Sequence, residues 1–182
     1  MTEKKMEHSY TLMHLLVTEA IRELDKQFEG TSEKSVPIES HLFEFGKKPG
    51  FALVGLLSKG GQDFELEDIP KFIANRVAPV VLGCPAHSNQ ISNKVITLQF
   101  KKTSSSQMPQ WFTALSGSPS PQQQLWIKAY SSFYMGVFTG ALTHMGYYVT
   151  PKFEFTQATL DFKFTIEELD PKKTWEFVCM NN

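Results

Sequence analysis

Cys84 and His87 are the one close pair of residue types in this chain that could support metal or thiol chemistry. A Cys-x-x-His spacing is half of a zinc site, and a thiol beside an imidazole is also the pair that a thiol-dependent hydrolase or transferase needs. A zinc site requires a second pair of ligands at a similar spacing. The remaining histidines stand singly along the chain: His8, His14, His41 and His144. We therefore expect no metal site.

Other residue types that can act in catalysis lack the partners that such chemistry requires. Ser104 to Ser106 has no nucleophile-elbow glycines around it, and Gly60-Gly61 belongs to no phosphate-loop pattern. Glu65, Glu67 and Asp68 are typical of a helix N-terminus, where the helix dipole favours negative charge. The sequence thus predicts no catalytic residues and no cofactor, and the protein is not expected to be an enzyme.

Charge and hydropathy narrow the classes of partner. The 18 Lys and Arg residues balance 19 Asp and Glu residues, so nucleic-acid binding has little support. No apolar run approaches the roughly 20 residues that span a bilayer. The first six residues, Met1 to Met6, lack the apolar core of a secretory signal. We expect a cytoplasmic protein whose membrane contact is peripheral and indirect.

The first half of the chain is predicted to be helical. One apolar stripe has the i, i+3, i+4, i+7 spacing of an amphipathic helix: Met13, Leu16, Val17, Ala20, Ile21, Leu24 and Phe28. Leu12 and Leu15 widen this face, and Gly30 marks a stop.

A second apolar segment, residues 38–57, contains Pro49, which removes a backbone donor and predicts either a kink or a helix that begins near Lys48. A third helix is expected to begin near Asp68 as its cap, with Pro70 in the first turn. Pro79 is expected to kink or end it, and Gly83 closes the unit.

The strongest helix pattern covers residues 122–145. Ser120 and Gln123 form a capping-box pattern around Pro121, and Gly146 stands at the expected stop. Its apolar stripe is Trp126, Tyr130, Tyr134, Val137, Phe138, Ala141, Leu142 and Met145. Gly136 and Gly140 lie one turn apart within it. Each glycine costs about 1 kcal/mol relative to Ala in a helix interior, so the pair predicts close packing against another backbone.

Strand patterns follow the helices. Residues 94–101 alternate between apolar and polar types, residues 111–115 are a shorter strand candidate, and residues 149–156 and 160–167 form an alternating hairpin. We expect an α+β fold in which helices cover one face of a small, twisted antiparallel sheet of about four strands. The expected organisation is one domain over residues 1–182 with a flexible loop at about 103–121. The ends, 1–7 and 170–182, are left unassigned.

Three segments, in this order and spacing, resemble the small α/β subunits of the transport protein particle (TRAPP) tethering complex. The first is Leu42-x3-Gly46-x3-Gly50-x2-Leu53. The second is Asp63-Phe64 followed by Phe72-Ile73-Ala74 and Leu82-Gly83. The third is Tyr130 to Gly146, containing Gly136, Gly140 and Ala141-Leu142-Thr143-His144, and followed by Thr159-Leu160 and Lys163-Phe164. The pattern is closest to subunit five, with subunits three and six as alternatives. Pro49 and Pro79 depart from the family's uninterrupted helices.

The resemblance implies a non-catalytic scaffold that joins sister TRAPP subunits, as a hetero- or homodimer, through its first two helices. The expected partner interface is Leu12, Leu15, Leu16, Leu42, Phe45, Leu53 and Leu56, and the expected close-packing glycines are Gly46, Gly50, Gly136 and Gly140. The complex tethers vesicles in ER-to-Golgi transport, at the Golgi and ER–Golgi membranes, and acts as an exchange factor on a Rab-type GTPase, which the single chain would meet only through the complex. Subunit three carries an acylated cysteine where Gly61 stands here, so acylation is not expected.

Two other hypotheses stay open. Related folds hold haem or an acyl chain between the helices and the sheet, and the 15 phenylalanines could line such a pocket in a small-ligand sensor. The last hypothesis is a hydrolase or transferase that uses Cys84 and His87.

Overall fold

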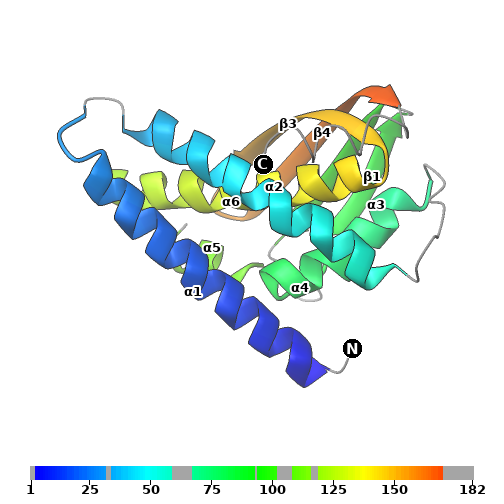
Figure 1. Ribbon diagram of the computed structural model, residues 1–182, viewed down its shortest axis with the longest axis horizontal. Helices are drawn as coiled ribbons and strands as arrows, with labels where there is room; N and C mark the ends of the chain where they lie inside the picture. Colours follow the sequence, from blue (N-terminus) through cyan, green and yellow to red (C-terminus); the bar gives the residue numbers. More distant parts are fainter. Residues whose placement is uncertain are drawn as a thin grey trace.

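The computed structural model describes residues 3–31, 34–58, 67–92, 94–101, 108–115 and 119–169. Its description of side chains covers 11–31, 34–58, 67–88, 94–101, 108–114 and 119–167. Figure 1 shows the arrangement of the helices and strands. The helical elements are α1 (Glu3–Gln27), α2 (Ser35–Leu57), α3 (Ile69–Phe72), the π-helical turn η1 (Ile73–Val77), α4 (Ala78–Leu82), α5 (Gln110–Leu115) and α6 (Pro121–His144). The strands are β1 (His87–Ser92), β2 (Val95–Lys101), β3 (Tyr147–Phe155) and β4 (Thr159–Leu169).

The four strands form one antiparallel sheet in the order β1-β2-β4-β3. The alternation along β4 places Leu160, Phe162 and Phe164 on the face that meets the helices. Phe138 of α6 contacts the rings of Phe162 and Phe164 with centroid distances of 5.4 and 6.3 Å. Helices thus cover one face of the sheet, and the predicted α+β class is confirmed (Figure 1).

Helix α6 is the centre of the core. Its N-terminus has the predicted capping box: Gln123 N donates to Ser120 Oγ at 3.3 Å, and Ser120 N donates to Gln123 Oε1 at 2.8 Å. From Ile127 to Leu142 nearly every side chain is buried, because α2 covers one side of α6 and the sheet covers the other. The central position of α6 explains why it is apolar on more than one face.

The prolines are accommodated inside helices. Helix α2 continues through Pro49, so the alternative start near Lys48 is wrong. The third predicted helix spans α3, η1 and α4 and ends at Gly83, whose φ of 75° is the left-handed conformation that favours glycine. The π-helical turn lies directly before Pro79, where the ring removes a donor and crowds the preceding turn. Asp68 stands at the predicted N-cap position but makes no side-chain cap hydrogen bond.

Two predictions about the middle of the chain are wrong. The strand expected at residues 111–115 is helix α5, which also lies inside the expected loop at 103–121. Thr113 N donates to Pro109 O at 3.1 Å, and the Trp111 ring stacks on Tyr130 of α6 at 4.9 Å. A short apolar run fits a strand or a helix equally well, so packing against α6 decides its state. The second strand of this half is instead β1, whose polar sequence lacks an alternating pattern.

Candidate partner-binding face

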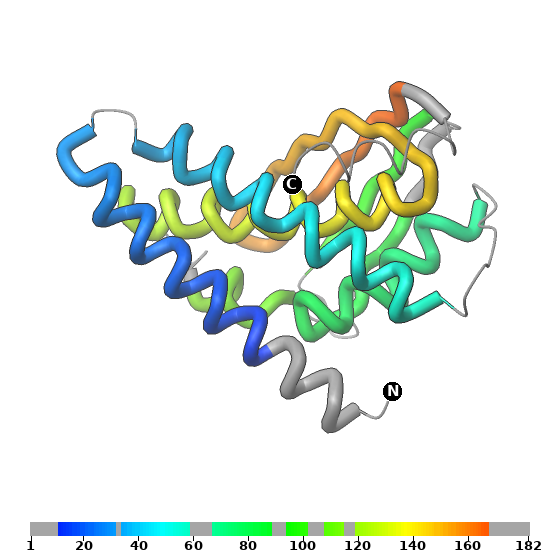
Figure 2. The backbone as a smooth tube through the Cα atoms, in the orientation of Figure 1, coloured from blue at the N-terminus to red at the C-terminus, as the bar shows by residue number. Residues whose placement is uncertain are grey.

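The candidate site, called the candidate face below, is the set of exposed large apolar side chains on α1 and α2. Figure 2 shows the two helices diverging from the segment that joins them. Near this closed end, the ring of Phe28, the residue directly after α1, contacts the ring of His41 of α2 at 5.7 Å, and Lys34 Nζ pairs with Asp25 Oδ1 at 2.7 Å. Because the helices then separate, each keeps one long side free of the other.

Helix α1 carries three exposed leucines: Leu12, Leu15 and Leu16 are 62%, 55% and 54% exposed. Val17 and Ile21, on the opposite side of the same helix, are fully buried. Leu16 was expected in the buried stripe, and that expectation is wrong. The stripe predicted from spacing was too broad, because only the residues nearest Val17 and Ile21 meet the rest of the molecule.

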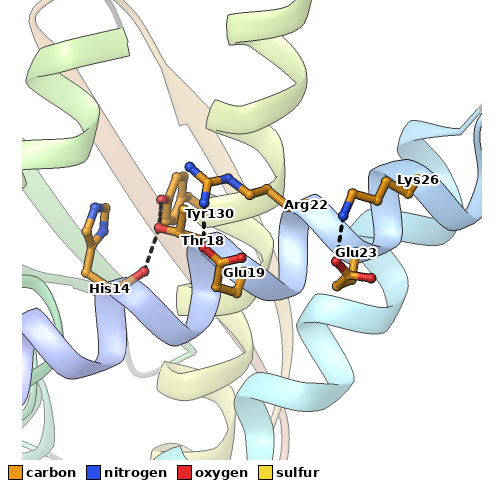
Figure 3. A network of polar contacts seen from close by, with 7 residues as sticks. All are labelled: His14, Thr18, Glu19, Arg22, Glu23, Lys26 and Tyr130. Carbon is orange, nitrogen blue, oxygen red and sulfur yellow. Dashed lines mark hydrogen bonds and ion pairs between the residues drawn. The ribbon is translucent and has the colours of Figure 1, made fainter.

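Helix α1 is fixed to α6 by a small polar and aromatic cluster (Figure 3). The hydroxyl groups of Thr18 and Tyr130 lie 2.6 Å apart, and Thr18 Oγ1 also donates to the His14 carbonyl at 2.7 Å. The His14 ring stacks on Tyr130 with centroids 5.3 Å apart and planes 9° from parallel. Burial lowers the pKa of His14, so the neutral imidazole is favoured in this stack. These contacts hold the leucines of α1 facing away from the core.

Helix α2 has two apolar faces, of which one is buried and the other is exposed. Its buried stripe, with a four-residue spacing, is Ile38, Leu42, Gly46, Gly50 and Val54. Phe45 and Leu56 lie on a neighbouring face and are 52% and 80% exposed. Leu42 was predicted in the partner interface, but it is 1% exposed and packs in the core. Leu53 is half-buried against the core and offers little surface to a partner. Val36, which was not predicted in the partner interface, is 62% exposed at the start of α2.

The four glycines lie where α2 and α6 cross. A Cβ atom at Gly46 would lie 2.2 Å from the Phe133 carbonyl oxygen, and one at Gly50 would lie 1.9 Å from that of Val137. From the other helix, Cβ atoms at Gly136 and Gly140 would lie 2.1 Å from the carbonyl oxygens of Phe43 and Lys47. Only a residue without a side chain permits this approach of two backbones. The tight crossing leaves one flank of α2, with Phe45 and Leu56, facing outward.

Cys84, the candidate nucleophile, lacks the surroundings of a reactive thiol. Cys84 is 2% exposed, and burial raises its pKa to about 12, whereas a nucleophilic thiol needs a lowered pKa. His87 is exposed at the start of β1. Within the residues that the structure describes, no three His, Cys, Asp or Glu side chains gather as metal ligands. Ser104 to Ser106, Gly60, Gly61 and Glu65 lie outside those residues.

The long helices of the chain differ from membrane spans. Among the described residues, no helix combines the length and the apolar character that crossing a bilayer requires.

A solved structure has a similar architecture. It is the crystal structure of a trafficking protein particle complex subunit 3 from Naegleria fowleri covalently bound to palmitic acid. The match covers 88% of this chain and 98% of that chain, with a TM-score of 0.61 and 19% sequence identity. The two proteins share a fold. No protein-family model matches this sequence, and no curated protein matches it.

The match extends over most of both chains. Because it includes nearly all of the subunit 3 chain, the correspondence applies to the whole architecture and not to one supersecondary unit. Sequence identity of 19% supports the fold alone. The exposed leucines and Phe45 are therefore interpreted from the surface of this chain itself.

Proposed function

We propose that this chain is a non-catalytic, TRAPP-like small subunit that binds a sister subunit through α1 and α2. The observation that carries the proposal is the exposed apolar face of the hairpin: Leu12, Leu15, Leu16, Phe45 and Leu56. Its support from comparison is the shared fold with a trafficking protein particle complex subunit 3. In this proposal the complex tethers vesicles and acts as an exchange factor on a Rab-type GTPase in ER-to-Golgi transport. The chain would be cytoplasmic and peripheral to Golgi membranes.

Removing these apolar side chains from water would stabilise a complex. Fully burying an exposed Leu or Phe is worth about 1.5–3 kcal/mol. The five residues are each more than half exposed. Covering them would contribute on the order of 5 kcal/mol, which is the scale of a hot-spot cluster at the centre of a protein interface.

Coexpression tests the proposal directly. The chain is coexpressed with candidate sister TRAPP subunits, and copurification is followed by size-exclusion chromatography with light scattering. We expect a 1:1 complex that buries about 1,200 Å² or more in total. The same result with a second copy of the chain would give the homodimer form of the interface.

Two variants link the complex to the face. Leu16→Asp combined with Leu56→Asp is expected to abolish the complex while leaving thermal unfolding of the isolated chain nearly unchanged, since both side chains are exposed. Gln157→Asp, at an exposed position in the turn between β3 and β4, is the matched control and should retain binding. The proposal fails if no sister subunit binds, or if the double Asp variant binds as tightly as the parent chain.

An alternative is a ligand-binding domain for an acyl chain, and the palmitic acid carried by the subunit 3 structure is the observation that favours it. In this chain the space between α6 and the sheet holds large buried rings, including Phe138, Phe162 and Phe164. Gly61, where the resemblance places the acylated cysteine, lies outside the described residues. Native mass spectrometry of protein purified from its own cells distinguishes the two: a retained fatty acid supports the alternative, and an unmodified mass argues against it.

A further inference from the structure

The sheet face that points away from the helices carries charged side chains in an ordered pattern. Phe162 and Phe164 of β4 face α6, so Asp161 and Lys163, which alternate with them, point to the opposite side. Lys152 lies directly opposite Lys163 in the β3–β4 pair, and Glu154 lies directly opposite Asp161. The pairing therefore creates a basic row, Lys152 and Lys163, beside an acidic row, Glu154 and Asp161.

This arrangement conflicts with the ordinary preference of antiparallel strands. Like charges directly opposite each other destabilise a strand pair, whereas opposite charges stabilise it. Exchanging Lys152 with Glu154, or Lys163 with Asp161, would have produced two favourable pairs. Among the described residues, none of these four side chains forms an ion pair within 4 Å. A local rule broken twice at adjacent positions is a feature expected of a functional surface.

The two rows are complementary to each other. The residues of the rows are two apart along each strand, so the rows lie roughly 7 Å apart. Consider a two-fold axis that lies between two sheets, parallel to the rows and midway between them. Rotation about this axis places Lys152 over Glu154 of the second copy and Lys163 over Asp161 of the second copy. Both relations are then repeated by symmetry, as in any isologous interface.

We propose that the sheet face opposite the helices, where Lys152, Glu154 and Lys163 are exposed and Asp161 is half-buried, is a self-association surface, and that its occupant is a second copy of this chain stacked sheet to sheet. The aligned stacking of two twisted sheets permits this arrangement. The proposal is independent of the α1–α2 face, which lies on the helical side of the molecule (Figure 1).

The size and chemistry of the face define what kind of association to expect. Three strands at about 4.8 Å spacing and four rows of side chains at about 7 Å give a footprint of roughly 400 Å². An interface of this area belongs to the weak, transient class. Its side chains are polar, so charge pairing is the main attraction and salt will screen it. The expected product is a reversible dimer that forms at high protein concentration and low ionic strength.

Charge-row variants test this proposal. Every protein carries Leu16→Asp and Leu56→Asp, so that the α1–α2 face contributes no association. The acidic variant adds K152E and K163E, and the basic variant adds E154K and D161K. Far-UV circular dichroism checks that each variant is folded, and sedimentation velocity over a concentration series measures association at ionic strengths of about 0.02 M and 0.5 M.

The parent should dimerise at low salt and dissociate at high salt. Each row variant alone should associate at least about tenfold more weakly, because both of its rows then carry the same sign. An equimolar mixture of the acidic and basic variants should regain association as a heterodimer. The proposal is overturned if the parent shows no salt-sensitive dimer, if either row variant associates like the parent, or if the mixture fails to regain association. The salt response of the parent alone decides the matter if a row variant does not fold.

Discussion

Replacing a glycine at the crossing of α2 and α6 tests how much the close contact of the two backbones contributes to the free energy of unfolding. In Gly50→Ala, the added Cβ would lie 1.9 Å from the Val137 carbonyl oxygen, and also 2.6 Å from the carbonyl carbon. Both atoms belong to the backbone of a buried helix, so neither can rotate away. A tolerable contact requires about 3.0 Å or more, and the two helices must therefore separate locally by at least about 1 Å.

Two opposing effects set the change in the free energy of unfolding of Gly50→Ala. Replacing a helical glycine by alanine stabilises the helix by about 1 kcal/mol. Opening the crossing loosens the buried contacts of α2 with α6, and overpacking of this kind costs roughly 1–3 kcal/mol, and more where the neighbours cannot move. Since backbone opposes the methyl group here, we expect the cost to exceed that range, at about 3–5 kcal/mol, which leaves a net loss on the order of 2–4 kcal/mol in the free energy of unfolding.

Gly55→Ala is the matched control in the same helix. A Cβ at Gly55 would meet only the His144 side chain, at 3.6 Å, which is ordinary contact. Because Gly55 is exposed, this variant should gain up to about 1 kcal/mol from helix propensity. Urea unfolding followed by far-UV circular dichroism, with linear extrapolation, measures both changes. The reasoning is refuted if Gly50→Ala and Gly55→Ala have equal free energies of unfolding.

Three further predictions concern single side chains. Burial lowers the pKa of His14 and of His144 below the ordinary value of 6.5. The stability that these neutral imidazoles contribute is therefore fully present above pH 6.5 and is lost as the pH falls through their folded pKa values. His144→Gln should reduce the slope of the unfolding free energy against pH between pH 7.5 and 5.5, and an unchanged slope would contradict this. Burial raises the pKa of the Cys84 thiol to about 12, so the thiol should resist alkylation by iodoacetamide at pH 8 in the folded chain and react after unfolding in urea. Rapid labelling of the folded chain would instead support the hypothesis of a thiol-dependent enzyme. Tyr130→Phe removes the 2.6 Å hydrogen bond to Thr18 and should lower the free energy of unfolding by about 1 kcal/mol; no loss in urea unfolding would show that the bond to α1 contributes nothing.

Local chemistry alone predicted the elements that depend mainly on their own residues. The capping box at Ser120 and Gln123 and the stop at Gly146 set the limits of α6 to within a residue. The alternating residues of β3 and β4 likewise predicted their hairpin. In each case neighbours within a few positions supply the hydrogen bonds or the repeating pattern, so the signal is present in the order of residues.

Tertiary packing decided the elements whose local pattern is ambiguous. Residues 110–115 form a helix because Trp111 and Phe112 pack against α6 and β3, respectively. β1 has little strand pattern of its own and forms by pairing with β2 at the sheet edge. A short segment gains too little from its own backbone to select one state, so its neighbours determine that state.

The candidate face was also predicted in part by the sequence and decided in part by tertiary packing. Spacing alone showed that α1 and α2 each have a broad apolar surface, and the paired glycines indicated that a backbone lies close to α6. Which apolar side is covered depends on the neighbour: the glycine crossing seats Leu42 in the core, while Phe45 and Leu56 on the adjacent side stay exposed. A helix sequence defines which residues share a face, but only the packed structure defines which face remains in contact with water, because burial is a property of the neighbours and not of the helix itself.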